Sequence, residues 1–398
     1  MHIFFVTEWY PTEKHPTYGV FILEHARAVS KIHRVSLLHV HGVDQTLHQA
    51  VQITREQVHQ NLIIYHLSYR RPMLPYTSWF RKYTSAYRVF NLASGQFGRP
   101  DVIHANVNST AGESVFLGRI ANIPVVMSEF SSAYGRKLFK RWRIPFIRFF
   151  MNRVNLIMPD SDDLAQHIRT YGIHRPMIKV HNVVDADLFY PAEAGEQVTS
   201  PYREVTIIAR LDKEKAVELA IQAIERLQSQ EIYIILHIVG DGKERSQLEA
   251  LVSELHLSDW VIFHGFQPKA ELARLIRRSS VFVLSSLWES KPVVILEALT
   301  CGLPVIAPAL GGIPEVITPS CGLLFKPGDL DDLVDKLSSM LSRLEDYDAQ
   351  VIRSYAVDTF SQGAVGKRLN AIYQQIVADQ HAFDKQALAD SGRSATFQ

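Results

Sequence analysis

Short apolar runs alternate with amphipathic stretches along most of the chain. In the first half the apolar runs have the length and the β-branched content of buried strands. They are HIFFVT, RVSLLHV, NLIIYHL, DVIHAN, PVVMSEF, NLIMPD and MIKVHNVV. Helical patterns such as VFILEHARAVSK and DDLAQHIRTYG lie between them. Strands that alternate with helices form parallel sheets covered by helices, so this half predicts a doubly wound α/β domain.

The alternation pauses at the polar segment PAEAGEQVTSPYR, residues 191–203, which we expect to be a linker. It then restarts with EVTIIAR, YIILHIVG, WVIFHGF, VFVLSS, PVIAP and CGLLF. A chain of 398 residues also exceeds the size at which a single core stops growing. The sequence therefore predicts an α/β protein of two Rossmann-like domains, residues 1–190 and 204–360, facing a central cleft that binds a ligand. A last helix is expected over 361–381, followed by a flexible tail, 382–398.

The composition is that of an ordinary globular protein, with 47% hydrophobic and 21% charged residues. No run of about 18 apolar residues is present to span a bilayer, and Met1 leads directly into a strand pattern. We therefore expect a cytoplasmic protein. Its two cysteines, Cys301 and Cys321, lack metal-ligand spacing and suit a reducing compartment.

The charge is unevenly distributed, with an excess of seven Lys and Arg over residues 1–200 and an excess of six Asp and Glu over the rest. A basic half favours an anionic partner. Residues 135–154, GRKLFKRWRIPFIRFFMNRV, interleave basic and large apolar side chains as an interfacial helix does. We expect peripheral contact with an anionic membrane surface, the inner face of the plasma membrane. The alternative is a solvated basic face whose apolar side enters the core; nucleic acid is not expected, because no recognised motif is present.

Two glutamates, Glu289 and Glu297, stand eight residues apart in LWESKPVVILEALTCGLPVIAP. We expect Ser290 to cap a helix that begins near Pro292, which places the carboxylates on the order of 10 Å apart. That spacing exceeds the ~5–5.5 Å of a retaining hydrolase pair. The two acids are better suited to hold two hydroxyl-bearing groups of one ligand, with a phosphate at the helix start between them. The alternative is a surface glutamate and another that caps or forms a salt bridge.

Arg210 and Lys215, in IIARLDKEKAVELA, follow a predicted strand and can point into one βα crevice. Two cations there could stabilise a leaving diphosphate in place of a metal ion. Gly240 begins a GDG turn that lacks the third glycine of a dinucleotide fingerprint, and no P-loop motif occurs. These absences disfavour dehydrogenases and P-loop enzymes. His39 and His41 form a lone HxH, a pattern more typical of packing than of metal binding.

Several of these stretches, in order and spacing, resemble the retaining glycosyltransferases of family 4, which have the GT-B fold. The stretches in the second half are ARLDKEKA, HIVGDGKER, VIFHGF and SSLWESKPVVILEALTCGLPVIAPALGGIPEVI. The last contains the E-x7-E motif of that family. In the first half PTYGVFILEHARAV is similar to the family's glycine loop, DVIHAN to its acceptor-side strand, PDSDDL to its serine turn and VHNVVDADLFYP to its interdomain segment.

The resemblance implies a role for each matching position. Arg210 and Lys215 would bind the diphosphate, Glu289 the transferred sugar and Glu297 the ribose. The remaining donor-side positions are Gly19, Gly240, Ser290, Lys291, Pro292, Val293 and Val294. The acceptor-side candidates are His104, Asn106, Glu129 and Phe130. The resemblance also implies transfer with retention, no cofactor, no obligatory metal, and a last helix that crosses back to the first domain.

Three positions depart from the family pattern. Glycine is usual where Ala216 and Val183 stand, and histidine where Phe130 stands, close to the reacting centre. We therefore expect a glycosyltransferase that uses a nucleotide diphosphate sugar and a saccharide or lipid-linked saccharide acceptor of a surface polysaccharide or lipopolysaccharide. The alternatives are a sugar-nucleotide epimerase or a phosphorylase on the same fold, or a nucleotide-sugar binding protein with weakened catalysis.

Overall fold

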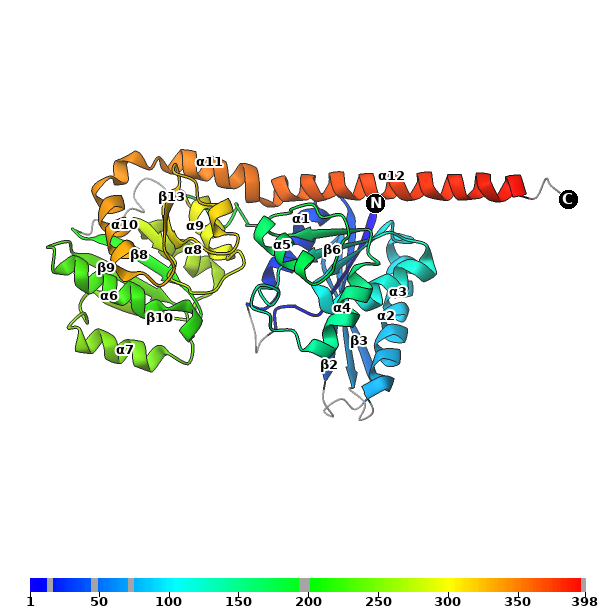
Figure 1. Ribbon diagram of the computed structural model, residues 1–398, viewed down its shortest axis with the longest axis horizontal. Coiled ribbons are helices and arrows are strands. Elements are labelled where there is room, and N and C mark those ends of the chain that lie inside the picture. The colour runs from blue at the N-terminus through cyan, green and yellow to red at the C-terminus, as the bar shows by residue number, and fades with distance from the viewer. Residues whose placement is uncertain (13–16, 44–48, 71–74, 193–200, 395–398) are drawn as a thin grey trace. The chain divides into compact units, whose positions relative to one another are not determined.

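The computed structural model describes residues 1–12, 17–43, 49–70, 75–192 and 201–394. The chain divides into two compact units (Figure 1). The first contains residues 1–181 and 362–398, and the second contains residues 182–361. The predicted linker, residues 191–203, lies within the second unit, and its central part, 193–200, is outside the described residues.

The first unit is built on a seven-stranded sheet with the order β3-β4-β2-β1-β5-β6-β7. Its strands are β1 His2–Thr7, β2 Arg34–Val43, β3 Val51–His59, β4 Leu62–Arg70, β5 Val102–Asn106, β6 Val125–Glu129 and β7 Leu156–Pro159. All pair in parallel except β3, which runs antiparallel to β4 at the edge of the sheet. The apolar runs did not predict β3, because its side chains are mostly exposed and polar.

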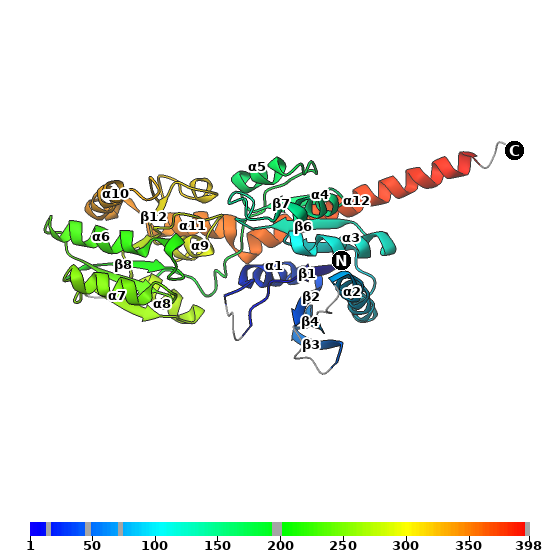
Figure 2. The ribbon, with the colours of Figure 1, turned by 60° about the horizontal axis from the view of Figure 1, so that its bottom comes forward.

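Helices cover both faces of this sheet. They are α1 Val20–Ser30, α2 Pro75–Phe97, α3 Ala111–Ala121, α4 Ile144–Met151, α5 Asp162–Thr170 and α12 Gln362–Ser394. Successive residues of a strand point to opposite faces. Phe4 accordingly meets Phe90 of α2, with ring centroids 5.4 Å apart, whereas Phe5 lies against His104, which hydrogen-bonds to Tyr373 of α12. Helices α2 and α3 lie side by side in both Figure 1 and Figure 2.

The second unit has a six-stranded parallel sheet with the order β10-β9-β8-β11-β12-β13. Its strands are β8 Arg203–Ile208, β9 Ile234–Val239, β10 Val261–Gly265, β11 Val281–Val283, β12 Val305–Pro308 and β13 Gly322–Phe325. Its helices are α6 Val217–Gln228, α7 Arg245–Glu254, α8 Lys269–Arg278, α9 Val293–Thr300, α10 Leu330–Ser342 and α11 Ala349–Phe360. This is the 3-2-1-4-5-6 Rossmann order, in which ligands bind where the strand order reverses, here between β8 and β11.

The boundary between the units falls at residue 181, before the predicted domain end at 190. Residues after it pack in the second unit: Val184 N donates to the Phe360 carbonyl over 2.9 Å, and Phe189 is fully buried there. The predicted strand MIKVHNVV is wrong. Ile178 and Val180 donate to carbonyls of β7, but the chain then leaves this edge for the second unit before a strand can form.

Two helix predictions also needed correction. Residues 135–154 do not form one interfacial helix, because helical structure covers only the 3-10 turn Arg141–Arg143 and α4, Ile144–Met151. The final helix, α12, runs to Ser394, beyond the predicted end at residue 381. It belongs to the first unit, where Gln362 donates to Glu24 over 2.9 Å.

Candidate active site

A largely buried ion pair lies at the point of strand reversal in the second unit. Lys215 ends the 3-10 turn Lys213–Lys215 that follows β8, and Glu289 lies in the loop that follows β11. The Lys215 Nζ is 2.6 Å from Glu289 Oε1, and the two side chains are only 19% and 12% exposed. Parallel strands direct their carboxyl ends to one edge, which explains why residues 74 positions apart meet there.

Two serines that sequence reasoning missed hold this pair in place. Ser286 donates to Glu289 Oε1 over 2.9 Å, and Ser285 donates to the Lys215 carbonyl over 3.0 Å. The Leu287 N–H also donates to the Glu214 carbonyl over 2.8 Å. The loops after β8 and β11 therefore form one connected structure. The available signal was the SS dipeptide directly after the apolar run VFVL.

Arg210, the other predicted cation, lies apart from this pair. Its side chain is 65% exposed and pairs with Asp212 and Glu214 of its own loop. The structure thus brings Lys215 and Glu289 into contact and leaves Arg210 in solvent, with neighbouring carboxylates that compensate its charge.

Helix α9 begins one turn after Glu289. Its N-cap residue is Pro292, so the expected cap by Ser290 is wrong. The Ser290 carbonyl instead accepts the Gly312 N–H over 2.7 Å, and the carbonyl of the buried Lys291 accepts from Asn182 over 3.3 Å. Val293 begins the helix, where backbone N–H groups lack intrahelical acceptors.

Val294, Glu297 and Gly240 are the other predicted donor-side residues of the second unit. Val294 lies in the first turn of α9, and Glu297, further along the helix, is buried. Gly240 has φ 133°, and a β-carbon there would lie 1.9 Å from the Ala209 carbonyl oxygen, so only glycine lets the turn after β9 approach the loop after β8.

In the first unit, the acceptor-side candidate Glu129 is a buried hub. Its Oε1 accepts the N–H groups of Phe130 and Ser131, each over 3.0 Å. Its Oε2 accepts the N–H of Asn108 over 2.8 Å and the hydroxyl of Tyr134 over 3.2 Å. Burial raises the pKa of the Glu129 carboxyl above its ordinary value, although these hydrogen bonds oppose the shift. Glu129 fixes the loop after β5 rather than reaching solvent.

His104 and Asn106 are fully buried in β5 as well. The His104 ring lies between the Tyr373 hydroxyl, 2.7 Å away, and the Ser128 hydroxyl, 2.8 Å away. Burial lowers the pKa of His104 well below 6.5, so the ring is neutral. The Asn106 amide donates to the carbonyls of Val6 and His104.

Phe130 packs in a small apolar cluster with Ile22 and Val107. Its ring meets Phe21 edge-on, with centroids 4.8 Å apart. Gly19 is the N-cap residue of α1, with φ 73°, and a β-carbon there would lie 2.3 Å from the Trp9 carbonyl oxygen. The first unit therefore needs a glycine at this position for its own packing.

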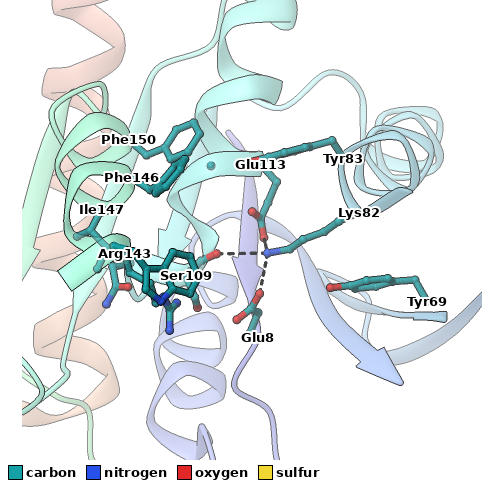
Figure 3. Close-up of a pocket in the computed structure, with 13 residues that line it drawn as sticks. Glu8, Tyr69, Lys82, Tyr83, Ser109, Glu113, Arg143, Phe146, Ile147 and Phe150 are labelled. Atoms are coloured by element: carbon teal, nitrogen blue, oxygen red, sulfur yellow. Dashed lines mark hydrogen bonds and ion pairs between the residues drawn. The ribbon is translucent and has the colours of Figure 1, made fainter. Parts of the chain in front are cut away.

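A cavity of about 290 Å³ opens beside the loop after β5 (Figure 3). At its centre Lys82 Nζ lies 2.6 Å from Glu8 Oε1 and 2.8 Å from Glu113 Oε1. Burial alone would lower the pKa of Lys82, but the two carboxylates outweigh it and raise the pKa above its ordinary value. No local pattern in the sequence indicates this cluster, because its members come from positions far apart in the chain.

The described residues contain neither a cluster of metal ligands nor a helix that could span a membrane. Within the described ranges, no three His, Cys, Asp or Glu side chains gather in an arrangement that could hold a metal ion. In the part of the chain that the structure covers, every helix is too short or too polar to span a bilayer.

Solved structures share this architecture. Sucrose-phosphate synthase from Thermosynechococcus elongatus is similar with a TM-score of 0.75 and 19% identity, over 95% of this chain and 99% of that one. Anabaena Alr3699/HepE in complex with UDP gives a TM-score of 0.71 and 19% identity, over 94% and 99%. The fold is therefore GT-B, as the sequence predicted, with two Rossmann-like α/β units.

Each of the two units matches a family model of glycosyltransferases. The model described as Glycosyl transferases group 1 matches residues 194–356, and the model described as Glycosyltransferase Family 4 matches residues 18–188. This chain belongs to the family 4 glycosyltransferases.

Curated relatives match over part of their length. Sulfoquinovosyl transferase SQD2 of Arabidopsis thaliana is 29% identical over 266 residues, which cover 61% of this chain and 50% of that protein. The putative colanic acid biosynthesis glycosyltransferase WcaL of Escherichia coli is 28% identical over 243 residues, covering 58% and 59%. The chain thus spans about half to three-fifths of the length of these relatives.

Proposed function

We propose that this protein transfers a sugar from a nucleotide diphosphate sugar to a hydroxyl of a saccharide acceptor, with retention at the anomeric carbon. The observation that carries the proposal is the Lys215–Glu289 pair at the strand reversal of the second unit. An ammonium, a carboxylate and the start of α9 together suit a ligand that combines a diphosphate with hydroxyl groups. The solved structures of HepE with UDP and with UDP-glucose support a donor of this class.

In this mechanism Lys215 exchanges its carboxylate partner for the donor diphosphate. The cation and the N–H groups of Val293 and Val294 stabilise the charge that develops on the leaving group, with Arg210 as a second cation. Glu289 then accepts hydrogen bonds from hydroxyls of the transferred sugar, and Glu297 from the ribose. The departing phosphate oxygen accepts the acceptor proton on the donor's own face, so no side-chain base is required and the sugar keeps its configuration. We propose no metal ion in this step.

The remaining donor-side positions act through the backbone. We propose that Gly240, Ser290, Lys291 and Pro292 shape the loops that border the diphosphate, and that Gly19 shapes the loop before α1. The acceptor is proposed to be a saccharide or lipid-linked saccharide in surface polysaccharide or lipopolysaccharide synthesis. Relatives named for colanic acid and amylovoran biosynthesis support this pathway class.

We also propose that the first unit contacts an anionic membrane from the cytoplasmic side. Residues 130–159 contain no acidic residue, and Leu138, Trp142, Phe146 and Phe149 are all exposed there. The alternative for this segment was a solvated basic face whose apolar side enters the core. Ile147 and Met151 of α4 are indeed buried in the core. The short helix therefore has both a buried apolar side and exposed apolar side chains.

A panel of nucleotide sugars tests the proposed function. Thermal shift selects the donor, because a ligand at a hundred times its Kd adds about 2.7 kcal/mol of stability. Transfer to a saccharide is then followed by NMR, and the anomeric coupling of the first product reports its configuration. Retention is expected. Product formation without an acceptor would favour an epimerase, and donor binding without turnover would favour the weakened binding protein that Phe130 suggests.

A further inference from the structure

Three aromatic side chains meet at the amino ends of neighbouring strands in the second unit. Tyr202, Tyr233 and Trp260 directly precede β8, β9 and β10. The Trp260 ring centroid lies 4.8 Å from that of Tyr202 and 5.3 Å from that of Tyr233. Trp260 also packs against the core, whereas Tyr202 and Tyr233 are 41% and 46% exposed. This aromatic cluster is therefore anchored on one side and open to solvent on the other, at the edge of the sheet opposite to Lys215 and Glu289.

The aromatic cluster continues into an open face of β10. Trp260 and Ile262 are two residues apart, so their side chains point to the same face of the strand. Ile262 pairs with His237 of β9, whose ring contacts the His264 ring, which places His264 on this face too. Ile262 is 41% exposed, so this part of the sheet is open to solvent. The four residues from Trp260 to His264 span about 13 Å of strand.

A chain of hydrogen bonds determines how His264 meets solvent. Burial is the main cause that lowers the pKa of His237 and of His264 below 6.5, so both rings are neutral. His237 Nε2 lies 3.1 Å from Glu204 Oε2, and His237 Nδ1 lies 2.9 Å from His264 Nε2. Because a carboxylate only accepts, His237 donates through Nε2 and accepts from His264 through Nδ1. His264 Nδ1 remains as an acceptor that has no hydrogen-bond partner among the described residues.

This combination of groups suits an oligosaccharide. Aromatic rings stack on the apolar C–H faces of pyranose rings, and an imidazole nitrogen can accept a hydroxyl hydrogen bond. At about 150–250 Å² for a whole aromatic side chain, Tyr202 and Tyr233 together expose roughly 170 Å². A stable protein interface buries about 800 Å² on each partner, so the patch is small for a second protein. Single-stranded nucleic acid needs a basic groove, whereas residues 201–398 carry an excess of six acidic residues.

We propose that the aromatic cluster and the open face of β10 form a second saccharide site, which binds an oligosaccharide away from the donor site. Tyr233 and Trp260 contact the faces of its sugar rings, and His264 Nδ1 accepts one of its hydroxyls. The choice of a saccharide rests on the proposed function, because sugar transfer supplies such a chain as substrate or product. The binding itself does not depend on turnover. A site of this kind raises the local concentration of the saccharide at the enzyme.

Ligand-observed NMR on the full chain, without donor, tests the proposal. The probes are maltotriose, cellotriose and laminaritriose, with methyl glucoside as the single-ring comparison. At least one trisaccharide should show saturation transfer, and methyl glucoside should bind at least tenfold more weakly. The double variant Tyr202→Ala with Tyr233→Ala should bind the trisaccharide at least tenfold more weakly than the parent. Tyr87→Ala, which alters an exposed tyrosine of the first unit, should bind as the parent does.

His264→Phe separates the hydroxyl contact from ring stacking. A phenyl ring retains an aromatic side chain at this position but cannot accept the hydrogen bond, so the affinity for the trisaccharide should fall about fivefold. Thermal unfolding shows whether each variant is folded. Unchanged affinity in a folded His264→Phe would contradict the contact assigned to this residue.

The outcomes separate this proposal from the proposed function. No trisaccharide binding by the parent, equal binding by parent and double variant, or binding of a single-stranded oligonucleotide instead would overturn the proposal even if transfer proceeds. Self-association that the double variant loses, without saccharide binding, would overturn it in favour of a second copy of the chain. Trisaccharide binding that the double variant loses, in a protein that transfers no sugar, would support the second site and contradict the proposed function. In an active enzyme the double variant should keep kcat/KM for a monosaccharide acceptor within about twofold.

Discussion

Ala216 connects the 3-10 turn that carries Lys215 to helix α6, and its backbone is left-handed, with φ 44° and ψ 45°. Only glycine adopts this region without cost; for alanine it costs about 1–2 kcal/mol. The resemblance places glycine at this position in related proteins. This departure from the family pattern is therefore a point of local strain directly beside the proposed catalytic lysine.

Replacing Ala216 by glycine should stabilise the protein. Relief of the left-handed strain outweighs the roughly 0.5–1 kcal/mol that glycine costs through the unfolded chain, so the free energy of unfolding should rise by up to about 1 kcal/mol. Val183→Gly is the matched control, since Val183 is buried and is not among the described non-glycine residues with positive φ. In Val183→Gly, urea unfolding should show a lower free energy of unfolding than in the parent. A destabilised Ala216→Gly would show that the turn does not carry this strain.

Phe130→His should leave transfer within about tenfold of the parent. The ring sits in an apolar cluster, with its centroid 5.5 Å from that of His25, and a neutral imidazole is small enough to fit. If the departing phosphate accepts the acceptor proton, a base at this position is not needed. The measurement is kcat/KM with one donor, with Glu289→Ala expected to lose far more. A folded but inactive Phe130→His beside an active parent would show that the phenyl ring itself is required.

At the scale of elements, α12 is fixed to the first unit by histidines. His33 Nε2 lies 2.8 Å from Asn370 Oδ1, and His104 Nδ1 lies 2.7 Å from the Tyr373 hydroxyl. Burial lowers the pKa of both rings below 6.5. The unfolded chain takes up protons at these histidines first, as the pH falls through about 6.5. The contribution of the two neutral rings to the free energy of unfolding is therefore complete above pH 6.5 and is lost as the pH falls toward their pKa values in the folded protein.

His104, whose pKa is lowered well below 6.5, should cost up to about 1.4 kcal/mol of unfolding free energy per pH unit below 6.5. Urea unfolding at pH 7.5 and about 5.5 measures this loss. In His104→Gln the loss should be smaller by roughly 1 kcal/mol, whereas His381→Gln, an exposed position of the same helix, should match the parent. An unchanged pH dependence in His104→Gln would mean that His104 is not the group that titrates.

Exposed apolar side chains around α4 should support membrane binding. Leu138 and Phe149 are 58% and 49% exposed and lie outside the lining of the first unit's cavity, so Leu138→Ser with Phe149→Ser tests docking without altering that lining. Sedimentation with anionic vesicles should fall at least tenfold in the double variant and should weaken with salt, since each nearby basic residue contributes about 1 kcal/mol. Tyr233→Ser, an exposed aromatic position of the second unit, is the control. Equal binding to neutral and anionic vesicles would contradict the proposal.

Most strands could be predicted from the sequence, because buried parallel strands are continuous apolar runs bounded by turn residues. The edge strand β3 could not, since its exposed face leaves only Val51 and Ile53 partly buried. The extent of α12 was also underestimated. The polar sequence after residue 381 is typical of a tail, whereas the structure continues the helix to Ser394.

At the scale of the whole chain, the donor-side cluster was predictable because its residues follow strands that end at one edge of a sheet. Lys215 and Glu289 each stand a few residues after an apolar run, and strand order brings them together. The cavity of the first unit was not predictable in this way. Glu8, Lys82 and Glu113 come from a loop and two helices, and no spacing between such positions indicates that they meet.

The central claim is that Lys215 binds and stabilises the donor diphosphate. The most direct test is the kcat/KM of sugar transfer by Lys215→Ala against Lys213→Ala, since Lys213 is an exposed lysine on the same 3-10 turn. Removing one group that stabilises developing charge should lower kcat/KM by roughly a hundredfold or more. Lys213→Ala should stay within about twofold of the parent, as expected for a surface substitution. Near-normal turnover in a folded Lys215→Ala, or equal losses in both variants, would contradict the account.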